Sequence, residues 1–161
     1  MVLGMSVATF TIVHVVISLI AIATGAVACA RMWEGRRLDG WSTVFLWTTI
    51  LTSVTGFLFP FNGFTPAIGV GIVSSVALAI ALVALYGGRL AGKWRWIYIC
   101  SAVFAFYLNV FVAVVQAFGK IGFLHALAPT GSEPPFAVTQ GVVLLGFIAL
   151  GILLIRRFRP A

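Results

Sequence analysis

The sequence predicts an all-α integral membrane protein, an up-and-down bundle of five transmembrane helices. The chain has 161 residues, of which 62% are hydrophobic and only 8% are charged. So few charges cannot cover the surface of a soluble domain. Five apolar stretches are each long enough to cross a hydrocarbon core, which takes about 20 helical residues. The Lys and Arg residues lie between or after these stretches, except that Arg95 is the first residue of the fourth.

The predicted helices cover about residues 4–30, 42–60, 66–87, 95–118 and 136–155 of a single domain, residues 1–161. Because the first apolar run is nearly 30 residues long and no basic residue precedes it, we expect an uncleaved helix rather than a signal peptide. Pro60 ends the second helix and Pro66 opens the third, since proline is tolerated only in the first turn. Short connections make consecutive helices antiparallel neighbours.

The external segment 119–135 is too apolar to be a simple solvated loop. It holds Ile121, Phe123 and Leu124 between Lys120 and the proline pair 134–135. A short interfacial or re-entrant helix is expected there.

Nine of the ten basic residues fall on one side of the predicted membrane. The nine are Arg31, Arg36, Arg37, Arg89, Lys93, Arg95, Arg156, Arg157 and Arg159, and Lys120 lies on the other side. Cytoplasmic loops hold Lys and Arg in excess, which places the N-terminus outside and the C-terminus in the cytoplasm. Positive-inside bias and anionic headgroups account for the net charge of +7, so no nucleic-acid partner is predicted.

The sequence carries no recognisable catalytic signature. A nucleophile elbow, a zinc-protease helix, a phosphate-binding loop and a dinucleotide fingerprint are all missing. All three acidic residues, Glu34, Asp39 and Glu133, lie in predicted loops, which disfavours proton-coupled transport. Cys29 and Cys100 fall near cytoplasmic helix ends, where thiols stay reduced. The protein is therefore predicted to lack enzymatic activity.

His14 is the candidate around which a binding site is predicted, because ionisable groups inside a membrane mark functional sites. Ser18, Ala21 and Gly25 follow it at helical spacing, and this stripe of small and polar residues should face another helix. Hydroxyls of the second helix and amides of the fourth lie at a similar depth. Together they predict a polar seam in the outer half, closed by the external loop. The predicted ligand-binding residues are His14, Ser18, Thr52, Thr55, Asn109, Gln116, His125 and Glu133.

The seam also has a purely structural interpretation. Ser and Thr can bond to their own main chain four residues back, and His and Asn often join helices. If it is a site, we expect a protein that binds a lipid-like or other apolar ligand, or that acts as a partner or assembly subunit. Besides the lipid bilayer, a membrane-protein partner or a homo-oligomer fits these roles.

Two other functions stay open. Thr, Ser and Asn side chains can line the path of an oligomeric channel or passive carrier for a small solute. A redox protein linked to haem or quinone is the third alternative. Haem would use His14 and His125 as axial ligands, since the chain has no other histidines. Apart from these two, no metal ligands are predicted.

Several runs resemble a family of small polytopic bacterial inner-membrane proteins without an assigned function. They are residues 52–60 (TSVTGFLFP), 94–98 (WRWIY), 107–111 (YLNVF), 127–130 (LAPT) and 132–136 (SEPPF). The resemblance spans nearly the whole chain. It implies the multi-pass topology and a location in the bacterial inner membrane, and it carries over no ligand or catalytic residue.

Overall fold

A computed structural model describes residues 1–36 and 39–159 of the chain and is all-helical. The elements are α1 (Val7–Trp33), α2 (Gly40–Phe57), α3 (Pro66–Leu82) with a π-helical extension η1 (Val83–Gly87), α4 (Lys93–Lys120), α5 (Gly122–Leu127) and α6 (Pro134–Arg157). In the described residues, the only β-type pairing is an isolated bridge between Val2 and Met5. The helical bundle expected from the sequence is confirmed, and α5 occupies the segment where a short helix was predicted.

Within residues 1–36 and 39–159, four helices are long and apolar enough to cross a membrane, namely α1, α3 with η1, α4 and α6. The predicted count of five spans is not confirmed, because α2 is not among them. Its 18 residues extend about 27 Å at 1.5 Å per residue, so its length is close to that of a span. Its composition sets it apart, since seven of the 18 residues are Ser or Thr.

Side chains at the helix starts explain where the helices begin. Ser6, Asp39 and Thr65 precede α1, α2 and α3, and each accepts a hydrogen bond from a main-chain N–H of the first turn. Such caps satisfy donors that have no partner inside the helix. Pro66 and Pro134 are the first residues of α3 and α6, where a missing N–H costs nothing.

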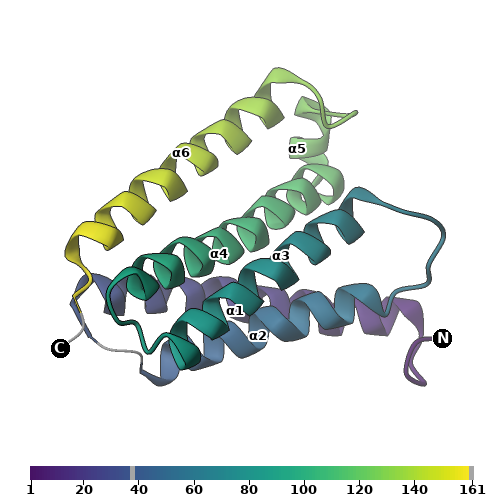
Figure 1. Ribbon diagram of the computed structural model, residues 1–161. Coiled ribbons are helices and arrows are strands. Elements are labelled where there is room, and N and C mark those ends of the chain that lie inside the picture. Colours follow the sequence, from purple (N-terminus) through teal and green to yellow (C-terminus); the bar gives the residue numbers. More distant parts are fainter. Residues whose placement is uncertain (37–38, 160–161) are drawn as a thin grey trace.

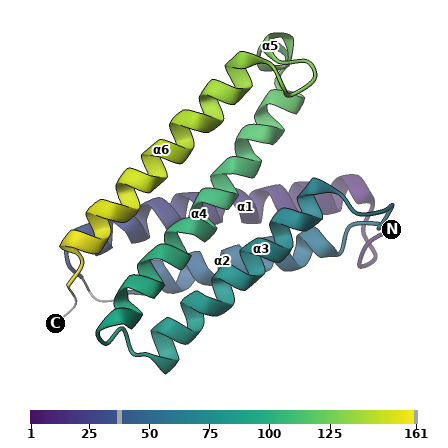
Figure 2. The same ribbon diagram turned by 45° about the horizontal axis from the view of Figure 1, so that its top comes forward.

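Helix α4 is the centre of the bundle and packs against α1, α2, α3 and α6. The other main pairs are α1 with α2 and α2 with α3. Figure 1 shows α3, α4 and α6 running obliquely in front of the α1–α2 pair, and Figure 2 shows the two groups crossing. Consecutive helices run in opposite directions, as the short connections required.

The tight core lies toward the end of the bundle where α1 and α6 end, α2 begins and the turn between η1 and α4 lies (Figure 1). We call it the basic end, because these segments hold Arg31, Arg36, Arg89, Lys93, Arg95, Arg156, Arg157 and Arg159. Tyr98, Ile99, Leu154 and Phe158 are fully buried there. Toward the opposite end, buried residues are sparse, and α6 has only Gln140 buried along its first half. The bundle is therefore closely packed at the basic end and open toward the other.

A glycine permits a close approach between α1 and α4. A Cβ built on Gly25 would lie 2.8 Å from Cδ2 of Phe106. The Phe106 ring cannot yield easily, because Phe45 and Phe147 pack edge-on against it at centroid distances of 5.9 and 4.9 Å. Gly25 and the fully buried Ala21 thus place the predicted small-residue stripe of α1 against the bundle.

Gly25→Ala should destabilise the protein by about 1–3 kcal/mol, because the new methyl group overpacks the contact between α1 and the Phe106 ring. The measurement is the free energy of unfolding in mixed detergent micelles. Gly146→Ala in α6 is the matched control, since a Cβ there meets nothing within 4 Å. Equal stability of the two variants would contradict the packing described.

Candidate functional site

His14 joins α1 to α2 through a side-chain hydrogen bond. Its Nδ1 lies 2.7 Å from Oγ1 of Thr55, and its ring meets Phe59 edge-on at a centroid distance of 5.4 Å. Phe59 also contacts the buried Phe10 at 5.0 Å. The imidazole is therefore held between a hydroxyl and an aromatic pair.

The bonding of Thr55 favours one tautomer of His14. The main-chain oxygen of Leu51 lies 2.7 Å from Oγ1 of Thr55 and can accept its single hydroxyl hydrogen. With that hydrogen on Leu51, the Nδ1–H of His14 donates to Thr55 and Nε2 is left as an acceptor. No described residue donates to Nε2.

Asn109 forms a second inter-helix bond, which joins α4 to α2. Its Nδ2 donates to Oγ1 of Thr49 over 3.2 Å, and Thr49 is completely buried. Thr49 and Thr55 are six residues apart, which corresponds to about 9 Å along α2. The predicted seam thus consists of two separate bonds, and its α4-facing member, Thr49, was not among the predicted site residues.

Other predicted seam residues are occupied by their own helices or exposed. Ser18 donates to the main-chain oxygen of His14 and Thr52 to that of Thr48, both over 2.8 Å. Gln116 lies exposed near the end of α4, and His125 lies exposed on α5, which packs on α4. The structure places the two histidines on different elements, α1 and α5, and the haem interpretation stays a prediction.

Glu133 organises its own turn at the start of α6. Its Oε1 accepts hydrogen bonds from the hydroxyl and main-chain N–H of Thr130, at 2.8 and 3.1 Å. Its Oε2 accepts one from the N–H of Ser132 at 3.1 Å. The Thr130 hydroxyl first, and then these main-chain donors, lower the pKa of the Glu133 carboxyl. The part of the external loop that holds Glu133 is therefore a turn bonded within itself.

Gln140 is a buried polar residue that the sequence reasoning missed. It lies on α6 with 9% of its surface exposed, and its Nε2 donates to the main-chain oxygen of Phe111 over 3.1 Å. Its Oε1 finds no partner among the described residues. The feature of the sequence that points to Gln140 is a single amide side chain within an apolar run, as at Asn109.

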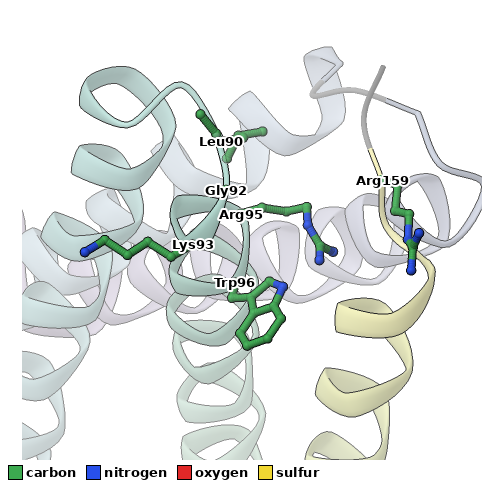
Figure 3. Close-up of a pocket in the computed structure, with 7 residues that line it drawn as sticks. Leu90, Gly92, Lys93, Arg95, Trp96 and Arg159 are labelled. Atoms are coloured by element: carbon green, nitrogen blue, oxygen red, sulfur yellow. The ribbon is translucent and has the colours of Figure 1, made fainter.

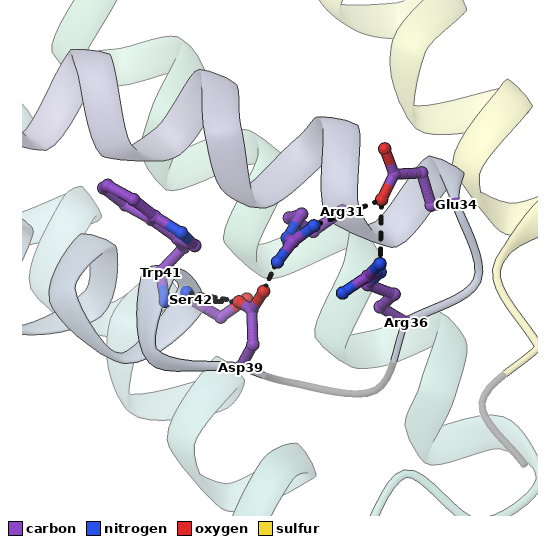
Figure 4. Close-up of polar contacts among 6 residues, drawn as sticks. All are labelled: Arg31, Glu34, Arg36, Asp39, Trp41 and Ser42. Carbon is purple, nitrogen blue, oxygen red and sulfur yellow. Dashed lines mark hydrogen bonds and ion pairs between the residues drawn. The ribbon is translucent and has the colours of Figure 1, made fainter.

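At the basic end, the connection from α1 to α2 is held by an ion-pair cluster (Figure 4). Arg31 contacts Asp39 at 2.8 Å and Glu34 at 3.4 Å, and Arg36 contacts Glu34 at 3.3 Å. Partial burial opposes ionisation of Asp39, but hydrogen bonds from Arg31 and from the Ser42 main chain outweigh it and lower the pKa. Arg37, also predicted at this end, lies outside the described residues.

Two further arginines bind main-chain oxygens at helix C-termini. Arg95 donates through Nη1 to the oxygens of Ile155, at 2.8 Å, and Phe158. Arg157 donates to the oxygen of Trp33 over 2.9 Å, and its guanidinium lies 4.5 Å from the Trp33 ring centroid. Cations at these positions satisfy orphan carbonyls and the negative end of the helix dipole. They also tie α6 to α4 and α1.

A pocket of about 660 Å³ opens beside Arg95 (Figure 3). It is lined by Leu90, Ala91, Gly92, Lys93, Arg95, Trp96 and Arg159. Figure 3 shows the Arg95 and Arg159 side chains on the same side of the turn, while Lys93 extends the other way. No acidic side chain lines this pocket, so its charge is positive.

A second hollow, of about 730 Å³, follows the outer surface between α3 and α4. Its lining residues are Ile72, Val73, Val76, Ala77, Ile80, Trp96, Ile97, Cys100, Ser101 and Phe104. We call it the α3–α4 groove. Its serine is already occupied, because Ser101 donates to the main-chain oxygen of Ile97 over 2.6 Å. The groove thus offers an almost wholly apolar surface, with Trp96 shared between it and the basic pocket.

Comparison with known proteins adds no family assignment. No protein-family model, curated protein or solved structure matches the chain. The resemblance to small bacterial inner-membrane proteins rests on the sequence runs alone and stays a prediction.

The His14–Thr55 bond can be measured with a double-mutant cycle of His14→Leu and Thr55→Val. We expect a coupling energy near the average of about 0.6 kcal/mol for inter-helix hydrogen bonds in membranes, with about 1.7 kcal/mol as the upper value. The free energy of unfolding in mixed micelles is measured for the unsubstituted chain, the two single variants and the double variant. Pairing His14→Leu with Thr48→Val should show no coupling, because Thr48 bonds main-chain oxygens of α2 and makes no bond to His14.

The pKa of Glu133 should lie below the ordinary value of about 4.3. Because the folded pKa is depressed, the turn gains stability above the unfolded pKa and loses it as pH falls through the folded pKa. An NMR titration of the side-chain carboxyl carbon measures this directly. Thr130→Val removes the largest cause and should move the pKa back up; an unchanged titration would contradict the bonding described.

Proposed function

We propose that the protein is a multi-pass protein of the bacterial inner membrane that binds a lipid-like molecule without carrying out a reaction on it. In this proposal the chain crosses the membrane five times, with the N-terminus outside and the basic end in the cytoplasm. The sequence resemblance and the positive-inside rule support this location and orientation.

The arrangement of α1 and α3 supports a crossing by α2. Both helices end at the basic end, where Arg31 and the turn after η1 lie (Figures 1 and 2). If both are spans, the chain between them has to return across the bilayer, and α2 makes that return. Helix α2 packs along α1. The hydroxyls of Thr48 and Thr55 donate to the main-chain oxygens of Val44 and Leu51, so they are satisfied within α2 and do not need water.

The observation that carries the proposal is the α3–α4 groove. Its volume of about 730 Å³ falls within the range of about 300–1,000 Å³ typical of small-molecule sites. Residues 72–80 of α3 and 96–104 of α4 line it, so it extends about 12 Å along both helices. An occupant without hydrogen-bonding groups, such as an acyl chain, matches its surface.

The outer seam has a supporting part in the proposal. Its two inter-helix bonds hold α1 and α4 to α2, and most of its other hydroxyls bond their own main chain. His14 Nε2 receives no hydrogen bond from the described residues, so a ligand hydroxyl at the outer leaflet would bind there. We assign the primary site to the groove, since it is concave and large enough for a lipid chain.

Filling the groove should reduce lipid binding. Val76→Phe adds bulk to a lining residue that is 55% exposed, and we expect a several-fold loss of lipid that co-purifies with the protein in mild detergent. Native mass spectrometry counts the retained lipids.

The matched control is Val142→Phe on α6, where the side chain is 64% exposed and lies outside the groove. It makes the same change on a lipid-facing surface and should leave lipid retention unaltered. Equal retention in both variants and the unsubstituted chain contradicts the groove as the binding site. Solute flux above background in liposomes favours the channel instead.

A further inference from the structure

We infer that the occupant is one anionic phospholipid of the cytoplasmic leaflet, with its phosphate in the basic pocket beside Arg95 and Arg159 and one acyl chain in the α3–α4 groove. This inference rests on the proposed function, because it uses the same groove. It adds the chemical class of the ligand and the site of its headgroup.

The first argument is continuity. Trp96 lines both the basic pocket and the apolar groove and is 54% exposed near the start of α4. Indole rings favour the level of the membrane where headgroups meet acyl chains. A molecule that crosses the Trp96 ring would therefore have its polar part on one side and its apolar part on the other, as a phospholipid does.

The second argument is uncompensated charge. Glu34 and Asp39 pair with Arg31 and Arg36, and Glu133 bonds within its own turn at the opposite end. None of the three acidic residues of the chain lines the pocket. Its cations are therefore available to an anion.

Arg95 supplies a positioned donor for that anion. Its Nη1 is used by the two carbonyl oxygens at the end of α6, which fixes the guanidinium plane. The Nε–H and the two Nη2–H groups have no acceptor among the described residues. A guanidinium has five N–H donors and binds phosphate oxygens well, so the group that caps α6 can also bind a headgroup.

The pocket wall is a turn with a constrained shape. Arg89 and Leu90 have φ values of 48° and 58°, and Gly92 has 52°; the left-handed region is uncommon for residues with a side chain. The N–H of Leu90 donates to the oxygen of Ala84 over 3.2 Å, and its side chain is only 6% exposed. Gly92 then precedes α4 without a side-chain cap, which leaves the positive end of that helix facing the pocket.

The test uses the full chain in phosphatidylcholine vesicles. Increasing fractions of phosphatidylglycerol with brominated acyl chains are added to the vesicles. Bromine atoms quench tryptophan fluorescence on contact. The Trp96 signal is the difference between the chain and its Trp96→Phe variant. We expect quenching to half-saturate at a phosphatidylglycerol fraction at least about fivefold below that needed with brominated phosphatidylcholine, since each basic residue near the surface contributes about 1 kcal/mol.

Arg159→Gln removes one pocket cation and should shift the phosphatidylglycerol curve about fivefold toward that of phosphatidylcholine. Arg156→Gln is the matched control, because it removes the same charge from the exposed end of α6 outside the pocket. Arg95 is not substituted, since it also caps α6.

The outcomes separate the two proposals. Half-saturation at the same low fraction for both brominated lipids overturns the anionic headgroup and leaves the groove as a lipid site. Equal effects of the Arg159 and Arg156 substitutions mean that net charge alone acts, which also overturns the pocket. Displacement of the brominated lipid by millimolar inorganic phosphate identifies a free-phosphate site instead. Quenching that only follows the bulk lipid fraction removes the inference together with the proposed function.

Discussion

The structure depends on the need to satisfy every polar group inside a medium that offers no water. Helices achieve this for the main chain, and the side chains follow the same constraint. Ser18, Thr52 and Ser101 each donate to a main-chain oxygen four residues back. At the basic end, Arg95 and Arg157 donate to carbonyls that the helices leave open. A residue that looks available in the sequence is often already bonded in the fold.

Because of this constraint, the proposed ligand site lies at the basic end and not in the half of the bundle that holds His14 and Asn109. In the outer half, His14 and Asn109 are bonded to threonines of α2, so they connect helices. At the basic end, the dense core positions α3 and α4 around an apolar groove, and Arg95 is anchored on α6 beside it. In the proposed function, the basic residues that set the orientation of the chain in the membrane thereby become neighbours of the groove assigned to a lipid chain.

Part of the candidate site was within reach of sequence reasoning. His14 was identified because an imidazole in an apolar run needs a partner, although the sequence did not say which helix supplies it. Thr52 was predicted to bind a ligand, and in the structure its hydroxyl donates to its own main chain, whereas Thr49, on the adjacent face of α2, meets Asn109. The choice between them depends on the rotation of α2 about its axis, which helix packing decides.

The sequence by itself determined the all-helical class, the clustering of basic residues at one end and the approximate helix ends, because hydrophobicity, charge and proline act locally. It did not determine that Asn109 would meet Thr49, that Gln140 would reach α4, or that Trp96 would join a basic pocket to an apolar groove. Those features belong to the tertiary structure, since a pocket exists only where separate helices meet at a particular angle and rotation.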